Sequence, residues 1–99
     1  MVKQINSAEF NEKLAAKEKM VVDFYADWCG PCKEMAPKLD ELSEKNTNAN
    51  FYKMNIEENM DVARTYKVMS IPNICFFENG ELKDRIIGAV DIFEVEKRI

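Results

Sequence analysis

The sequence predicts an α/β domain with a central mixed sheet of five strands and four helices that cover both faces of the sheet. Segments of strand character alternate with segments of helical periodicity, which favours parallel strands joined by helices. Residues 20–26 are almost entirely apolar, as expected of a central strand covered on both faces. An Asn-Gly pair near the end predicts a hairpin, which adds an antiparallel part. The expected order is βαβαβαββα, formed as a single domain over residues 1–99.

The chain begins with a short predicted edge strand at residues 2–6. A helix then follows to about residue 17, and its start is marked by Asn6 or Ser7, either of which is a good N-cap. The apolar residues 20–26 form the next strand, which we expect to be central in the sheet.

The second helix is predicted over residues 30–45, where apolar side chains recur at helical spacing. Pro31 suits its first turn, because the N–H that proline lacks has no partner there. Pro37 lies inside the helix and is expected to bend it. Residues 51–56 then form the third strand.

The last third of the chain contains one more strand pair between two short helices. The hairpin turn is Asn79-Gly80. Asp91 and Glu94 have the spacing of a capping box, which indicates where the final helix begins. The expected elements are a helix from Asn59 to about Tyr66, strands at 74–78 and 82–87, and a helix from Asp91 to Ile99.

Composition and charge exclude several classes of function. The chain has a net charge of −4, so we expect no nucleic-acid partner. No apolar run approaches the roughly 18 residues of a membrane span, and residues 1–6 do not resemble a signal peptide. We therefore expect a cytoplasmic protein. The absence of histidine excludes Cys-His and Ser-His catalysis and zinc sites built on histidine.

Cys29 and Cys32 lie directly after an apolar strand and at the start of a predicted helix. A thiol at a helix N-terminus faces unpaired N–H groups and the positive end of the helix dipole, and both favour the reactive thiolate. The spacing allows the two sulfurs to form a small disulfide ring or to open to a dithiol. The motif therefore predicts reversible dithiol–disulfide exchange. We expect Cys29 to be the more exposed, attacking thiol and Cys32 to be the resolving thiol.

Two other interpretations of this cysteine pair are half of a zinc site and an inert structural disulfide. A structural zinc site needs about four ligands, whereas only Cys75 and no histidine would be left to complete it. An inert disulfide is unusual in a cytosolic chain. Cys75 itself lies in an apolar strand, and we interpret it as a buried thiol without redox function; a regulatory or dimer-forming role is the alternative.

Asp23 is a carboxylate within the apolar segment 20–26. Burial of an unpaired charge is costly, so desolvation is expected to raise its pKa toward neutrality. The functional interpretation is that Asp23 accepts a proton from Cys32 and returns it, because no histidine is available for that role. The alternative is a paired structural carboxylate without a catalytic task.

Five ordered features of the chain resemble the thioredoxin family. The segment from Val22 to Lys33, which contains Trp28-Cys29-Gly30-Pro31-Cys32, is similar to its signature. The other matching segments are Pro37, Lys53-Met54-Asn55-Ile56, Ser70-Ile71-Pro72, and Phe76 to Glu81 with Gly88. The resemblance covers essentially the whole chain. It implies the thioredoxin fold and a protein-disulfide reductase that uses no bound cofactor.

The resemblance also implies roles for further site residues. Lys53 would lie beside Asp23 and oppose the rise of its pKa; a solvated strand lysine is the alternative. Pro72 would follow a cis peptide bond and pack against the disulfide, while the backbone of Ile71 pairs with a bound client. Gly30 and Pro31 would set the geometry and the reducing character of the cysteine pair. Trp28 and Gly88 would complete the docking surface, although plain packing is an equal alternative for Trp28.

The partners implied by the resemblance are a thioredoxin reductase and oxidised client proteins. Ribonucleotide reductase, peroxiredoxins and methionine sulfoxide reductases are the usual client types, and we expect a monomer. The chain departs from the family pattern at Tyr25, where tryptophan is common, at Asn73, where threonine is usual, and at Cys75, an additional thiol. Two alternatives of function stay open: a thioredoxin-fold module that only binds a partner, and an oxidant or isomerase of an oxidising compartment.

Overall fold

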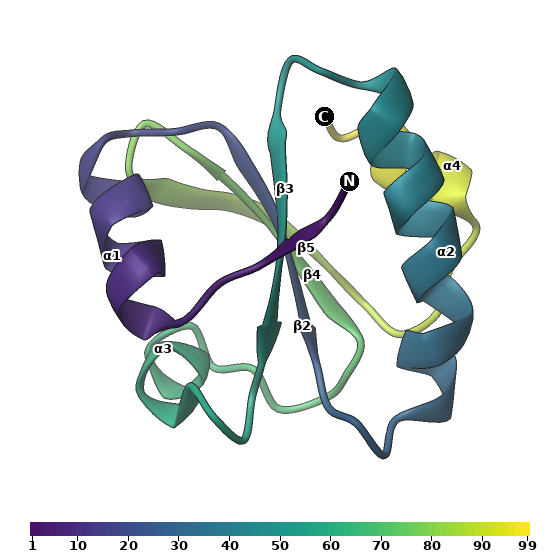
Figure 1. Cartoon of the computed structure of the whole chain (residues 1–99), viewed down its shortest axis with the longest axis horizontal. Helices are drawn as coiled ribbons and strands as arrows, with labels where there is room; N and C mark the ends of the chain where they lie inside the picture. Colours follow the sequence, from purple (N-terminus) through teal and green to yellow (C-terminus); the bar gives the residue numbers. More distant parts are fainter.

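The computed structural model describes all 99 residues and contains a five-stranded mixed sheet between two pairs of helices (Figure 1). The strands lie in the order β1-β3-β2-β4-β5. The first three of these run parallel, and β4 is antiparallel to its neighbours β2 and β5. The elements are β1 (Lys3–Gln4), α1 (Ser7–Ala15), β2 (Met20–Tyr25), α2 (Gly30–Lys45), β3 (Asn50–Asn55), α3 (Met60–Thr65), β4 (Asn73–Glu78), β5 (Glu81–Ile87) and α4 (Ile92–Glu96). The predicted class and element order are confirmed.

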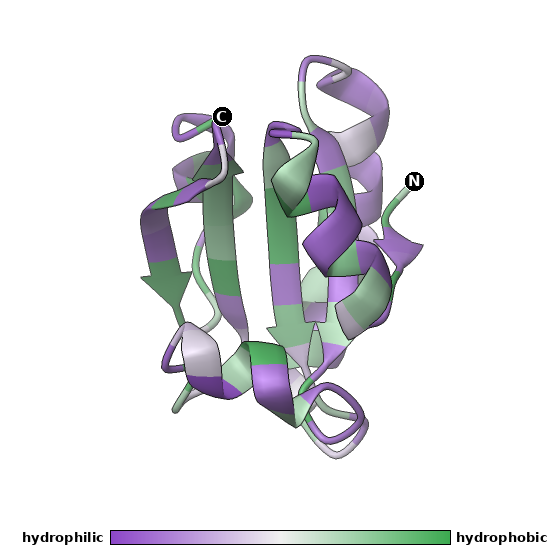
Figure 2. Ribbon diagram, turned by 90° about the vertical axis from the view of Figure 1, so that its left-hand side faces the viewer, coloured by the Kyte–Doolittle hydropathy of each residue, from purple (hydrophilic) through white to green (hydrophobic).

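Alternation of side chains along the strands builds one apolar core on each face of the sheet. Val21 and Phe76 belong to the core that includes residues of α2 and α4, whereas Val22 and Phe77 belong to the core that includes residues of α1 and α3. Figure 2 shows the second face, with largely hydrophobic strands behind helices that carry hydrophilic stretches. Since Asp23 follows Val21 by two positions, its side chain lies on the α2 face.

The helix that carries the cysteine motif was predicted with its correct bounds. It begins at Gly30 and ends at Lys45, with Pro31 in the first turn and Pro37 inside. With 16 residues it is the longest helix of the protein. None of the helices combines the length and the apolar character needed to cross a membrane.

The first and the last helix of the chain, α1 and α4, are shorter than predicted. Helix α1 starts after Asn6, whose side chain forms a capping box with Glu9, but it ends at Ala15, because Lys17 has a left-handed backbone with φ of 60°. Helix α4 ends at Glu96 instead of Ile99. The Asp91 carboxylate caps it by accepting from the Phe93 N–H.

The predicted capping box of α4 is only half present. Glu94 forms ion pairs with Lys97 and Arg98, three and four residues further along the chain. Arg98 also pairs with Asp84 of β5 at 2.9 Å. The Glu94 carboxylate is therefore used within the C-terminal segment, and Arg98 connects this segment to the sheet through Asp84.

Candidate active site

Strands β2 and β3 bring Asp23 and Lys53 together. The two residues are register partners in the parallel pairing of these strands, and both lie on the α2 face. Asp23 is buried, with 5% of its surface exposed, and Lys53 is half-buried. The Lys53 ammonium lies 5.9 Å from the centroid of the Tyr25 ring. Lys53 is thus held between the carboxylate and an aromatic face.

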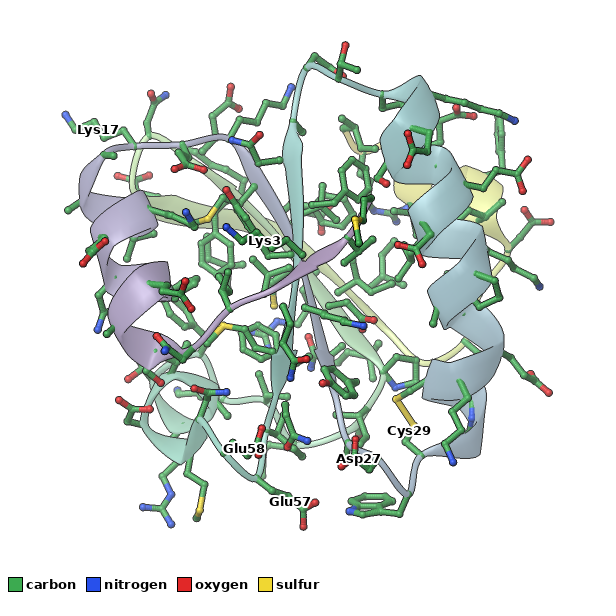
Figure 3. All side chains as sticks on the ribbon, in the orientation of Figure 1. Lys3, Lys17, Asp27, Cys29, Glu57 and Glu58 are labelled. Atoms are coloured by element: carbon green, nitrogen blue, oxygen red, sulfur yellow. A yellow bond between two sulfur atoms is a disulfide. The ribbon has the colours of Figure 1, made fainter.

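Cys29 and Cys32 form a disulfide at the N-terminus of α2, with their Cα atoms 5.3 Å apart (Figure 3). Cys29 is the N-cap residue of this helix, with an extended backbone, and its Sγ accepts the N–H of Cys32 at 3.2 Å. When the disulfide opens, the same N–H and the helix dipole favour a negative charge on the Cys29 sulfur.

The expectation that Cys29 is more exposed than Cys32 is wrong, because each retains only 4% exposure. Both belong to a small apolar cluster with Ala26, against which Ile56 and Ile71 pack. These neighbours come from the loops that follow β2, β3 and α3, so three separate segments pack together with the cysteine pair. In the disulfide form, the two cysteines differ in their polar neighbours and not in their exposure.

A cavity of about 130 Å³ adjoins Cys32 on the inner side of α2. Asp23, Tyr25 and Lys53 line it, whereas Cys29 does not. The Oδ1 atom of Asp23 is buried without a hydrogen-bond partner. An acid with an unused oxygen therefore shares a cavity with one of the two cysteines, and this cysteine is Cys32.

Burial raises the pKa of Asp23 from 3.8 to about 7, and the positive charge of Lys53 opposes this rise. Near neutral pH, both the acid and its carboxylate are therefore populated. A group in this state can take a proton from a thiol and return it without a large change in free energy.

Replacement of Lys53 by methionine is expected to raise the pKa of Asp23 above 7, because the opposing positive charge is removed. The pKa can be measured from the pH dependence of the ¹³C carboxyl resonance of Asp23. Lys33→Met is the matched control, since Lys33 also lines the cavity but is not a cause of the shifted pKa. An unchanged or lowered pKa in Lys53→Met would contradict the assigned interaction.

The predicted docking residues lie around the disulfide. Trp28, with 68% of its surface exposed, is next to Cys29 in sequence, and Gly30 and Pro31 are also exposed. The Ile71–Pro72 peptide bond is cis, and Ile71 packs against the cysteine cluster. Pro72 itself is buried, so it supports this surface from beneath.

Gly88, which directly follows β5, anchors the Pro72 loop. Its N–H donates to the Pro72 carbonyl oxygen at 2.8 Å, and its φ of 92° lies in the region that favours glycine. The same end of the molecule exposes Ile87, which sequence analysis did not single out. Its position as the last residue of β5, directly before the predicted docking residue Gly88, was a usable signal.

Sequence analysis also missed two exposed carboxylates, Glu57 and Glu58, which follow β3 at the same edge of the sheet as Asp27 after β2 (Figure 3). Because parallel strands end at the same edge of a sheet, acidic residues directly after both strands could have been placed together. Negative charges of Asp27 and Glu58 contribute to a raised pKa of Tyr25, after the larger effect of its burial.

Comparisons with known proteins agree with this geometry. The Thioredoxin family profile matches residues 1–99. Thioredoxin-2 of Saccharomyces cerevisiae is 43% identical over 90% of this chain and 88% of its own length. The oxidised mitochondrial thioredoxin 3 of Saccharomyces cerevisiae superposes with a TM-score of 0.90 at 35% identity, over 99% of this chain and 92% of its own.

A second solved structure comes from a study of thiol resolution in a yeast mitochondrial 1-Cys peroxiredoxin through glutathione and thioredoxin systems. Its matched chain has a TM-score of 0.89 and 34% identity, over 99% of this chain and 92% of its own. The family profile, the curated relatives and the solved structures thus all identify the same family. The chain belongs to the thioredoxin family, and its Cys29–Cys32 pair is the redox centre of a protein-disulfide oxidoreductase.

Proposed function

We propose that this protein reduces disulfides in client proteins, with Cys29 as the attacking thiolate and Cys32 as the resolving thiol. The observation that carries this order is the placement of Asp23. Its unpartnered carboxylate oxygen shares a cavity with Cys32 and not with Cys29. Cys29 needs no base, because the Cys32 N–H and the helix N-terminus already favour its thiolate.

The reaction follows in two exchanges. The Cys29 thiolate attacks one sulfur of the client disulfide, so a mixed disulfide forms and a client thiolate leaves. Asp23 then accepts the Cys32 proton, and the resulting thiolate attacks the Cys29 sulfur. The second client thiolate leaves, and the Cys29–Cys32 disulfide closes. Two electrons pass to the client, and the proton held by Asp23 is available to a departing thiolate.

The direction of electron flow and the partners are part of the proposal. The Gly30-Pro31 pair resembles that of reducing members of the family, which supports a reductase as electron donor. A peroxiredoxin-type client is supported by the similar chain that was solved in the study of a yeast mitochondrial 1-Cys peroxiredoxin. Ribonucleotide reductase and methionine sulfoxide reductase types rest on the family resemblance alone. The cytoplasmic location stays a prediction, since one similar structure is of a mitochondrial protein.

Insulin reduction together with the reduction potential tests this function. We expect the reduced protein to cleave insulin disulfides catalytically with dithiothreitol as electron source. We also expect a potential near the value of roughly −270 mV known for thioredoxin. No turnover would favour the partner-binding module instead. A potential far above this value would favour the oxidant or isomerase.

Asp23→Asn is expected to slow the second exchange more than the first, because only Cys32 depends on this base. The measurement is quenched-flow kinetics with insulin: samples are quenched with acid at successive times, and mass spectrometry follows the formation of the mixed disulfide and its attack by Cys32. Asp27→Asn is the control, since it removes an exposed carboxylate from the rim of the same cavity. Equal slowing of both exchanges by Asp23→Asn would refute the proton-transfer role.

A further inference from the structure

The two departures from the family pattern in β4, Asn73 and Cys75, contact one another inside the core. Both are fully buried and lie on the same face of the strand. The Asn73 Oδ1 atom accepts from the Cys75 thiol, with a sulfur–oxygen distance of 3.3 Å. The Asn73 Nδ2 atom donates to the Ser70 carbonyl oxygen at 3.3 Å. The side-chain amide therefore links a core thiol to the loop before β4.

The thiol fixes the direction in which this amide points. Burial raises the pKa of Cys75 to about 12, so its sulfur keeps its hydrogen at neutral pH and acts as a donor. The amide oxygen must then face Cys75, which leaves the amide nitrogen for Ser70. The opposite orientation would bring the amide oxygen against the Ser70 carbonyl oxygen and leave both without a donor.

The loop held in this way carries the docking residues. Ser70 directly precedes Ile71, which packs against the cysteine cluster. At its other end the loop is held by the Gly88 N–H, which binds the Pro72 carbonyl oxygen. One anchor is therefore the Gly88 N–H, directly after β5, and the other is the Asn73 side chain.

We propose that Cys75 and Asn73 are positioning residues that hold the Ser70–Pro72 loop in the conformation that receives the main chain of a client. The inference rests on the proposed function, because docking of a client is the task of this loop. Neither residue touches the reacting sulfurs. Cys75 thus has a use as a hydrogen-bond donor and needs no redox chemistry of its own.

The test compares a large and a small disulfide as oxidants of the reduced protein. Oxidation is followed by the fluorescence of Trp28, the single tryptophan, which adjoins Cys29. Insulin needs the docking loop, whereas bis(2-hydroxyethyl) disulfide has no main chain to dock. We expect Cys75→Val to lower the insulin rate constant about threefold and Asn73→Leu about tenfold. The rate constant with the small disulfide should stay unchanged in both variants.

Cys75→Ser restores a donor and should return the insulin rate constant to near the wild-type value. In the double variant Asn73→Leu/Cys75→Val, the valine should add no further loss, because the thiol acts through the amide. Ile74→Val is the matched control, since Ile74 is buried in the core on the opposite face of β4. It should not change the ratio of the two rate constants.

Three results would overturn the inference. They are an unchanged ratio of rate constants in Cys75→Val and Asn73→Leu, losses that simply add in the double variant, or a Cys75→Ser variant that is as slow as Cys75→Val. A wild-type protein that does not react with insulin would instead refute the proposed function. The two failures are therefore distinguishable.

Discussion

Replacement of Asp23 by asparagine is expected to stabilise the protein by about 2–3 kcal/mol at pH 8. A pKa raised from 3.8 to about 7 means that ionisation of Asp23 in the folded state costs about 4 kcal/mol relative to the unfolded chain. Asparagine has nearly the same shape and no charge, so this cost disappears. Part of the gain is lost because the amide must itself be buried at a position where one oxygen has no partner.

The pH dependence of stability provides a second signature of Asp23. Below pH 3.8 the group is protonated in both states and contributes nothing. Between pH 3.8 and about 7 the unfolded state has lost the proton while the folded state still holds it, so this contribution to stability falls as the pH rises. Above pH 7 the penalty is complete and constant. Asp23→Asn should lack this decline, so the stability difference between variant and wild type should grow as the pH rises through this range.

Urea unfolding of the oxidised protein at a series of pH values measures both effects. Asp27→Asn serves as the control, because it also removes one negative charge but at an exposed position. We expect the gain of Asp23→Asn over wild type to be small at pH 4 and largest at pH 8. A gain that is equal at both pH values would show that its origin is not the ionisation of a buried acid.

Asp23 illustrates which part of the site can be predicted from sequence. A carboxylate inside an apolar segment is conspicuous, and burial of that segment follows from its composition. The resemblance to the family implied that Lys53 lies beside Asp23, and the two residues are register partners in β2 and β3. The bounds of α2 were also predictable, because Gly30-Pro31 and the cysteines mark its start.

Features that depend on contacts between loops could not be predicted. Cys29 and Cys32 are buried in a cluster against which Ile56 and Ile71 pack from distant parts of the chain. The orientation of the Asn73 amide depends on its contacts with the Cys75 thiol and the Ser70 carbonyl oxygen, and a residue pattern does not contain this information. The capping box of α4 is only half formed because the Glu94 carboxylate forms ion pairs with Lys97 and Arg98 instead.

Cys32→Ser and Cys29→Ser should both abolish insulin turnover, but by different routes. A serine hydroxyl does not ionise near neutral pH, so we expect each variant to lose activity by on the order of a thousandfold or more. In Cys32→Ser the Cys29 thiolate can still attack, so a mixed disulfide with insulin accumulates because no resolving thiol remains. In Cys29→Ser the remaining thiol of the pair, Cys32, is not at the N-cap position, where the Cys32 N–H and the helix dipole favour a thiolate, so no such adduct should form.

A third thiol must be removed before this difference can be assigned to one sulfur. In a Cys75→Ser background, Cys32→Ser leaves Cys29 as the sole thiol, and Cys29→Ser leaves Cys32 as the sole thiol. Intact-mass spectrometry after acid quenching then reports which single sulfur bonds to insulin. An adduct with Cys32 alone, or equal adducts with both, would reverse or abolish the proposed order. An adduct with Cys29 alone would support the division of roles in which the helix N-terminus activates the first thiol and Asp23 serves the second.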